Sequence, residues 1–562
     1  MNEIHGFTQV RHQHIPELRT DAELYRHVKT GAEVLSLINE DENKVFGISF
    51  RTPPTDSTGV PHILEHSVLC GSRKYPVKEP FVELLKGSLK TFLNAMTYPD
   101  KTCYPVASQN VRDFYNLIDV YLDAVFYPRL NPFVLQQEGW HYEVDGPDGP
   151  LSYKGVVFNE MKGAYSSPET LLAEYSQQSL FPDTIYGLDS GGDPKQIPQL
   201  TYAQFKAFHE TYYHPSNARI FFYGDDSPED RLRILNGYFQ DFDMLEVNSS
   251  IPLQPLFDRP KKIIRSYASG KGDGQGGKSM FTLNWLFGET IDGALNLAFH
   301  MLEYILLGMP GSPLRKALID SGYGEDIAGD GLATELRQMY FSTGLKGIES
   351  ENAEKVEKLI LTTLTDLVHE GIDDRTVEAA LNTIEFNLRE NNTGHYPRGL
   401  SIMLRSLTTW LYQGDPLALI AFEAPLQDVK KKVAGSKGFF EGLISRYLLD
   451  NRHRTTLILK PDPDLADQET TDEKAALSKA RAAMTAARVG EIIRDNRKLK
   501  ELQEAPDSPE ALASIPVLKR SDLPKENTII PCEFSEMHGT RTLYHDLFTN
   551  GIVYLDLGFN IH

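Results

Sequence analysis

The sequence has 562 residues and a mass of 63.3 kDa, more than one hydrophobic core normally serves, so we expect roughly two to four domains. Its composition, 41% hydrophobic and 24% charged, is typical of a globular protein. A formal net charge of -21 at pH 7 argues against a nucleic-acid-binding surface and against binding to anionic membranes. Peptide partners, basic peptides in particular, remain compatible with this charge.

The cysteines and the N-terminal segment bear on location. Cys70, Cys103 and Cys532 are too few to build a disulfide framework, which favours a reducing compartment. Residues 1–20 contain acidic side chains and no apolar core of a signal or transit peptide, and no apolar run reaches the ~20 residues of a membrane span. We therefore predict a cytoplasmic protein without a membrane partner. Whether Cys70 and Cys103 respond to oxidation stays open.

Strand and helix patterns alternate through the first part of the chain. Apolar residues recur at helical spacing in 111–126, and Pro128 ends that pattern. The predicted elements in chain order are a strand at 45–52, a helix at 61–71, extended runs at 91–98 and 102–107, and the helix at 111–126. These patterns predict a mixed α/β domain over residues 1–255.

A second domain of the same kind follows a linker. Residues 256–278 gather prolines, basic residues and glycines, which is typical of a linker or loop. Beyond it, residues 279–460 predict a second α/β domain related to the first. Its predicted elements are a strand at 279–287 and helices at 291–307, 352–370 and 376–390.

Residues 461–525 are rich in helix formers until prolines interrupt them, which predicts a helical hairpin linker. The last part, 526–562, predicts a strand pair around Asn550-Gly551 and the beginning of a third, incomplete domain. A two-stranded sheet is marginal in water, so either another chain completes it or the sequence ends within a domain. The overall fold class predicted is α+β.

The stretch GVPHILEHSVLCG, residues 59–71, concentrates the candidate chemistry. Residues four apart on a helix lie on one side, so His62 and His66 can direct two nitrogen ligands at one metal ion. Glu65 projects beside them, where its carboxylate can accept a proton from a metal-activated water. Pro61 suits the first helical turn, and Ser57 or Thr58 can cap it.

A catalytic zinc ion normally has three protein ligands and leaves a fourth position for water. The best candidate for the third ligand is Glu160, in the stretch KGVVFNEMKGAYSS. The alternative is that the two histidines and Glu65 form only a polar seam on a helix surface. The pentapeptide alone does not decide between them.

The spacing HxxEH inverts the common zincin motif and marks the inverzincins. Together with the blocks at 59–108, 153–165, 190–225 and 550–559, it resembles the presequence protease and falcilysin group of the pitrilysin (insulinase-like) zinc metalloprotease superfamily. The resemblance extends from about residue 5 to the last residue. It implies two related pitrilysin-type domains with mixed, mostly antiparallel sheets and packed helices.

The resemblance also implies roles for individual residues. One zinc ion would be bound by His62, His66 and Glu160, with Glu65 as the general base that activates the attacking water. Asn94 and Ala95 would lie in a substrate-binding edge strand that adds the peptide as a further strand. An apolar substrate pocket would be lined by Leu69, Phe81, Val82 and Leu85, for which ordinary core packing is the alternative.

Full-length members of this group resemble a clamshell that encloses short unfolded peptides, and this sequence matches only the first half and the linker. The residues that steady the substrate would belong to the C-terminal half, which is missing here. Losing such donors costs ~10² to 10³ in rate each, so we expect a zinc-binding but weakly active chain. The alternative is a noncatalytic scaffold or peptide-binding subunit of a two-chain protease.

Two further motifs bear on function. GDGQGGKS, at 272–279, fits the P-loop pattern, but the alternating residues after Ser279 predict a strand where a P-loop requires a helix, so we predict no nucleotide binding. HMLEY, at 300–304, imitates the zinc motif with Tyr304 in place of the second histidine. It indicates that the second domain is noncatalytic.

Overall fold

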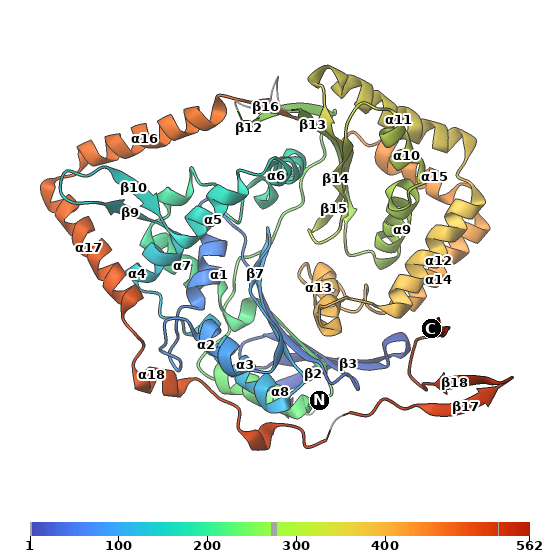
Figure 1. The fold of residues 1–562 in the computed structure, drawn as a ribbon, viewed down its shortest axis with the longest axis horizontal. Helices are drawn as coiled ribbons and strands as arrows, with labels where there is room; N and C mark the ends of the chain where they lie inside the picture. Colours follow the sequence, from blue (N-terminus) through green and yellow to red (C-terminus); the bar gives the residue numbers. More distant parts are fainter. Residues whose placement is uncertain (1–2, 271–277, 527, 562) are drawn as a thin grey trace.

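The computed structural model describes residues 3–270, 278–526 and 528–561. Two sheets with their helices face each other, and a long C-terminal segment runs around the outside of the molecule (Figure 1). Sheets and helices are both abundant and the strand pairs are mostly antiparallel, so the predicted α+β fold class is confirmed. Within the described residues, no helix combines the length and the apolar character that crossing a membrane requires.

The first sheet has nine strands in the spatial order β1-β2-β3-β4-β11-β5-β8-β6, and β7 also pairs with β8. All pairs are antiparallel except β4 with β11. The strands are β1 (Glu3–Ile4), β2 (Phe7–Ile15), β3 (Thr20–His27), β4 (Glu33–Ile38), β5 (Lys44–Arg51), β6 (Lys90–Leu93), β7 (Met96–Thr97), β8 (Lys101–Ser108) and β11 (Ala218–Gly224). The central strands β5, β8 and β11 are buried nearly throughout, because both faces of the sheet are covered.

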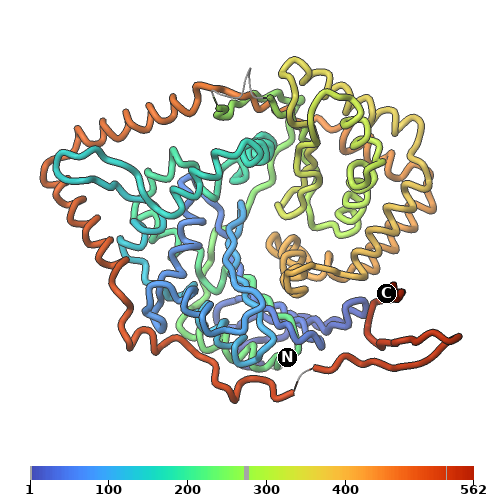
Figure 2. Tube along the Cα trace, in the orientation of Figure 1, coloured from blue at the N-terminus to red at the C-terminus, as the bar shows by residue number. Residues whose placement is uncertain are grey.

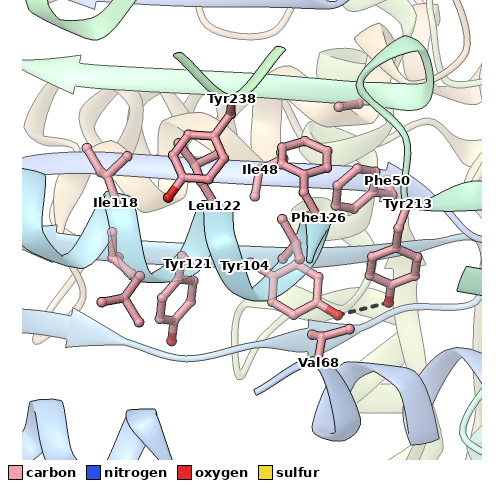
Figure 3. Close-up of a cluster of buried hydrophobic side chains, with 14 of the residues drawn as sticks. Ile48, Phe50, Val68, Tyr104, Ile118, Tyr121, Leu122, Phe126, Tyr213 and Tyr238 are labelled. Atoms are coloured by element: carbon pink, nitrogen blue, oxygen red, sulfur yellow. Dashed lines mark hydrogen bonds between the residues drawn. The ribbon is translucent and has the colours of Figure 1, made fainter. Parts of the chain in front are cut away.

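Helices from the first half cover one face of this sheet. These are α1 (Val60–Val68), α3 (Val111–Phe126), α7 (Tyr202–Tyr212) and α8 (Pro228–Phe239). The apolar stripe predicted for 111–126 is the buried side of α3, with Phe114, Ile118 and Leu122 fully inaccessible to solvent. Figure 3 shows this core, in which the hydroxyls of Tyr104 and Tyr213 share a 2.8 Å hydrogen bond. The remaining elements of this half are α2 (Pro80–Gly87), α4 (Pro132–Val134), α5 (Val156–Ala164), α6 (Pro168–Leu180) and the hairpin of β9 (His141–Val144) and β10 (Leu151–Lys154).

The second sheet repeats the first in a smaller form. Its order is β12-β16-β13-β15-β14, and only β12 and β16 are parallel, as β4 and β11 are in the first sheet. The strands are β12 (Lys261–Ala268), β13 (Ser279–Glu289), β14 (Asp326–Ala333), β15 (Gln338–Ile348) and β16 (Arg454–Asp462). The helices of this half are α9 (Gly293–Glu303), α10 (Pro313–Asp320), α11 (Ala353–Glu370), α12 (Asp374–Glu390), α13 (Arg398–Trp410), α14 (Glu423–Gly435) and α15 (Phe439–Ile444).

Two features differ from the predicted linker at 256–278. Residues 261–268 form strand β12, because their backbone pairs with β16 although their side chains are mostly exposed. Most of the glycine-rich pattern at 272–279 lies outside the described residues. Its last residue, Ser279, opens strand β13.

The two halves exchange helices. Helix α13 of the second half packs on the first sheet, with Met403 and Leu407 buried against Leu35, Val45 and their neighbours. Helix α6 of the first half packs on the second sheet through Leu171 and Leu172. Because each sheet is covered on one face by a helix from the other half, the halves are held in a fixed relation.

The C-terminal segment wraps around the first half (Figure 2). Helices α16 (Leu465–Ala483) and α17 (Ala486–Glu504) lie where the hairpin was predicted and pack on β9 and β10 through Leu477 and Ile492. After α18 (Pro509–Ser514) the chain reaches the hairpin of β17 (Glu533–Met537) and β18 (Thr540–Tyr544).

The strand pair predicted around Asn550-Gly551 is wrong. The turn of the observed hairpin lies at His538 and Gly539, and the described residues after Tyr544 belong to no strand. A strand requires a partner for its backbone groups, and residues 552–561 have no strand beside them in the described part of the chain. Many apolar side chains there are exposed, including Val553 at 89% and Phe559 at 80%.

Candidate metal centre

Helix α1 carries the HxxEH stretch against the first sheet. It begins at Val60 with Pro61 in its first turn, and its cap is Gly59 in a left-handed conformation with φ 71°. The expected cap by Ser57 or Thr58 is therefore wrong. A Cβ at position 59 would stand 2.7 Å from the carbonyl oxygen of Gly191, so this close approach requires glycine.

The structure brings the three candidate ligands together. The Nε2 atoms of His62 and His66 lie 3.8 and 3.7 Å from Oε2 of Glu160. All three ligand atoms lie within 4.8 Å of one another, and within the described residues this is the one such group of three. Ligand atoms around a tetrahedral zinc ion with ~2.0 Å bonds are about 3.3 Å apart, so small adjustments make this set fit zinc. The side chain of Glu160 is 55% exposed, which leaves one side of the group open.

Glu160 reaches the histidines because α5 packs very closely on the π-helical turn Leu135–Gly139. Gly155, at the N-terminal end of α5, has φ 152°, and a Cβ there would stand 2.1 Å from the carbonyl oxygen of Gly139. Only glycine permits both the conformation and the contact. This packing therefore sets the separation between Glu160 and α1.

The second ring nitrogen of each histidine is also held. Nδ1 of His62 lies 3.1 Å from the carbonyl oxygen of Gly191, and since a carbonyl only accepts, Nδ1 carries the proton and Nε2 is free to bind a metal. Nδ1 of His66 lies 3.3 Å from the buried carboxylate of Glu138. Burial lowers the pKa of His66, but the hydrogen bond to Glu138 and the nearby carboxylates outweigh it, so the pKa lies above its usual value. Carboxylate–histidine pairs of this kind orient metal ligands.

Glu65 lies on the same helix, half-buried. Burial first and the charge of Glu65 second raise the pKa of Tyr121 well above its usual value. The hydroxyl of Tyr121 donates to the backbone carbonyl of Asn94, at 3.3 Å. Glu65 is therefore within electrostatic reach of the strand that carries Asn94.

The predicted substrate strand is at an edge. Asn94 and Ala95 lie between β6 and β7, which pair only with β8. Asn94 is exposed and Ala95 half-buried. The opposite side of this strand thus has no strand partner in the described part of the chain, which is the geometry that strand addition requires.

The predicted pocket residues are distributed over two helices. Leu69 is half-buried at the end of α1, and Phe81 is half-buried on α2. Val82 and Leu85, also on α2, are 38% and 42% exposed, so ordinary core packing does not account for these two. The structure does not show a pocket formed by all four.

Sequence reasoning missed the groups that support the ligands: Glu138, the Gly139 and Gly155 contact, and the carbonyl of Gly191. The doublet Gly191-Gly192 within SGGDP was a signal for a close backbone approach. Glu138 carried no comparable signal, because its role depends on a contact with a helix distant in sequence.

Comparison with known proteins agrees with this geometry. Three family models match in order: Insulinase (Peptidase family M16) at residues 50–146, Peptidase M16 inactive domain at 199–384, and the associated domain of M16 peptidases of subfamily C at 459–562. The chain belongs to the M16 peptidase family. The predicted membership of the pitrilysin superfamily is thereby confirmed.

Individual relatives cover the whole chain. It is 54% identical to presequence protease 1, chloroplastic/mitochondrial, of Arabidopsis thaliana, over 99% of this chain and 52% of that protein. It is 45% identical to protein HypA of Clostridium perfringens, over 99% of this chain and 57% of that protein. This M16 chain thus spans about half the length of the curated relatives that it matches.

Solved structures share the fold. The peptidase M16 inactive domain from Pseudomonas fluorescens aligns with a TM-score of 0.61 at 15% identity, over 78% of this chain and 98% of that one. Pitrilysin aligns with a TM-score of 0.58 at 16% identity, over 94% of this chain and 52% of that one. The predicted repetition of pitrilysin-type domains is consistent with both.

Proposed function

We propose that this M16 chain is the catalytic portion of a zinc metalloendopeptidase that degrades short unstructured peptides. The observation that carries the proposal is the convergence of His62, His66 and Glu160, two nitrogens and one carboxylate oxygen, on one point. Two histidines with one glutamate are a common ligand set of catalytic zinc sites. The printed names of the relatives, which include presequence proteases, agree with peptide hydrolysis.

Zinc, when bound, would supply Lewis acidity that activates a water and polarises the scissile carbonyl. The chain's own residues supply the proton transfers. Glu65 accepts the proton of the attacking water at its carboxylate, and the resulting acid protonates the amine that leaves. The exposed carboxylate of Glu160 leaves space for a substrate beside the ligands.

The peptide would be held in extended form. Its backbone would pair with the free edge at Asn94 and Ala95, which selects unfolded segments because a folded chain has no free backbone to offer. The exposed apolar residues of α2, Val82 and Leu85, together with Phe81 and Leu69 would receive a side chain of the substrate.

We propose that full activity depends on a second polypeptide part, corresponding to the remaining length of the relatives. Two observations support this: the chain spans 52% and 57% of the relatives compared above, and apolar side chains from Ile529 to Ile561 are exposed in a way that a partner would cover. Without that part we expect zinc binding and feeble cleavage inside an incomplete chamber. We also propose a cytoplasmic location, supported by three cysteines that are all free.

The test is a zinc-to-protein ratio measured alongside cleavage of an unstructured peptide. We expect one zinc ion per chain, slow cleavage, and a rise in rate when the remaining half is added as a separate polypeptide. Glu65→Gln should keep the zinc ion and lose turnover, whereas Glu378→Gln, on the exposed side of α12, should change neither. Normal cleavage by Glu65→Gln would refute the assigned role. Zinc binding without any cleavage, even with the added half, would favour a noncatalytic subunit.

A further inference from the structure

A loop next to the metal centre is organised by one buried carboxylate. Asp189 is only 7% exposed. Its Oδ1 accepts hydrogen bonds from the backbone amides of Gly191, at 2.8 Å, and Gly192, at 3.2 Å. The carbonyl of Gly191 is the group that receives the Nδ1 proton of His62. Asp189 therefore fixes the peptide unit that sets the tautomer and orientation of His62.

The loop is also attached to the start of α1. The amide of Asp189 donates to Oγ of Ser57, at 3.0 Å, and the amide of Asp193 donates to the carbonyl of Ser57, at 2.9 Å. Gly59, the cap of α1, is in contact with Gly191. The loop and the helix that carries both histidines thus form one packed unit.

The same carboxylate reaches the element that carries the third ligand. Oδ2 of Asp189 accepts a hydrogen bond from the hydroxyl of Tyr165, at 2.7 Å. Tyr165 is the C-terminal cap of α5, about one turn beyond Glu160. Burial and the charge of Asp189 raise the pKa of Tyr165, so its hydroxyl stays protonated and able to donate. One side chain therefore connects the surroundings of His62 with the helix of Glu160.

We propose that Asp189 and Tyr165 are positioning residues of the metal centre, which hold His62 and Glu160 at the separation that a metal ion requires. Neither touches a ligand atom, and both act through the loop and through α5. This inference rests on the proposed zinc site. It adds to that site a tie between two ligand-bearing elements.

The experiment compares zinc dissociation constants, measured by competition with a chelator, for the wild-type chain and four variants. Asp189→Ala should weaken zinc binding by about 10- to 100-fold, the range typical of groups that support metal ligands. Asp189→Asn should recover much of the affinity, because its Oδ1 can still accept from both amides. Tyr165→Phe should cause a smaller loss than Asp189→Ala.

Asp193→Ala is the matched control in the same loop. Its carboxylate accepts from the amide of Lys195, at 2.9 Å, and from the side chain of Gln196, at 3.0 Å, and neither bond leads to His62 or to α5. We expect Asp193→Ala to bind zinc with close to wild-type affinity. Cobalt substituted for zinc should show an altered visible absorption spectrum in Asp189→Ala and Tyr165→Phe, because these change the ligand arrangement, and an unaltered one in Asp193→Ala.

The outcomes separate this inference from the proposed function. If the wild-type chain binds no zinc, the proposed site is wrong. If the wild-type chain binds zinc and Asp189→Ala binds it equally well, or Asp193→Ala loses as much affinity, the positioning role is wrong. If Asp189→Ala does not fold, wild-type affinity in both Asp189→Asn and Tyr165→Phe, together with an unchanged cobalt spectrum in Tyr165→Phe, overturns the inference.

Discussion

The replacement of Gly155 by alanine tests how the metal centre is assembled. Gly155 starts α5 with φ 152°, a conformation that residues with a side chain rarely adopt. The new Cβ would stand 2.1 Å from the carbonyl oxygen of Gly139 and 2.6 Å from its carbonyl carbon. Both atoms belong to the backbone, so no side-chain rotation relieves the contact.

The size of the effect follows from these distances. An ordinary carbon–oxygen contact is about 3.2 Å or longer, so α5 must withdraw from Gly139 by about 1 Å. The backbone conformation alone costs about 1–3 kcal/mol, and the contact adds to it, so we expect the free energy of unfolding to fall by about 3 kcal/mol or more. Zinc ligands tolerate displacements of only about 0.2 Å, so a 1 Å shift of Glu160 should weaken zinc binding by about 100-fold.

Chelator competition and thermal unfolding of the metal-free protein measure the two effects. Gly163→Ala is the matched control, since Gly163 lies on the same helix and a Cβ there meets no atom within 4 Å. Removal of a helical glycine should stabilise the chain by up to about 1 kcal/mol and leave zinc affinity unchanged. Wild-type zinc affinity in a folded Gly155→Ala chain would refute the argument that this contact places Glu160.

Three further changes test other parts of the structure. Glu138→Gln should weaken zinc binding about 10-fold by removing the negative charge beside His66, and Glu138→Ala more, as measured by chelator competition. Burial lowers the pKa of His453 to about 4, and its Nδ1 accepts from the amide of Phe257, so between pH 6.5 and 4 only the unfolded chain takes up a proton there. Stability should therefore fall with falling pH by up to about 1.4 kcal/mol per unit in that window, and denaturant titrations of His453→Gln should show a flatter slope; parallel slopes would contradict this. Met403→Ala, fully buried between α13 and the first sheet, should lower the unfolding free energy by about 2–5 kcal/mol, and a loss below about 1 kcal/mol would contradict the packing described.

Comparison of two similar stretches shows what the motif alone can predict. HILEH on α1 and HMLEY on α9 each follow a central strand, β5 and β13, at a similar distance along the chain. In the second half, the glutamate of this stretch, Glu303, accepts a backbone hydrogen bond from Leu332 of β14, at 2.9 Å, and so holds an edge strand. The same residue type thus has a structural role in one half and faces a metal-ligand set in the other.

Elements with strong local patterns were predictable. The helix at 111–126 coincides with α3, because its apolar period and its flanking residues are properties of the local sequence. The strand at 261–268 was missed, because its exposed, basic sequence carries no alternating pattern and its pairing comes from β16, far along the chain. The C-terminal strand pair was predicted in error for the same reason, since a turn signal does not provide a partner strand.

The sequence by itself determined that His62 and His66 face one side, because four residues span about one turn of any helix, and it determined the family through several motifs in order. Tertiary structure alone decided that Glu160 meets them, since that depends on the contact of Gly155 with Gly139. It also decided that Asn94 lies at an edge and that α6 and α13 are exchanged between the halves. Local geometry repeats every few residues and can be inferred from a short stretch, whereas contacts between distant segments depend on the packing of the whole chain.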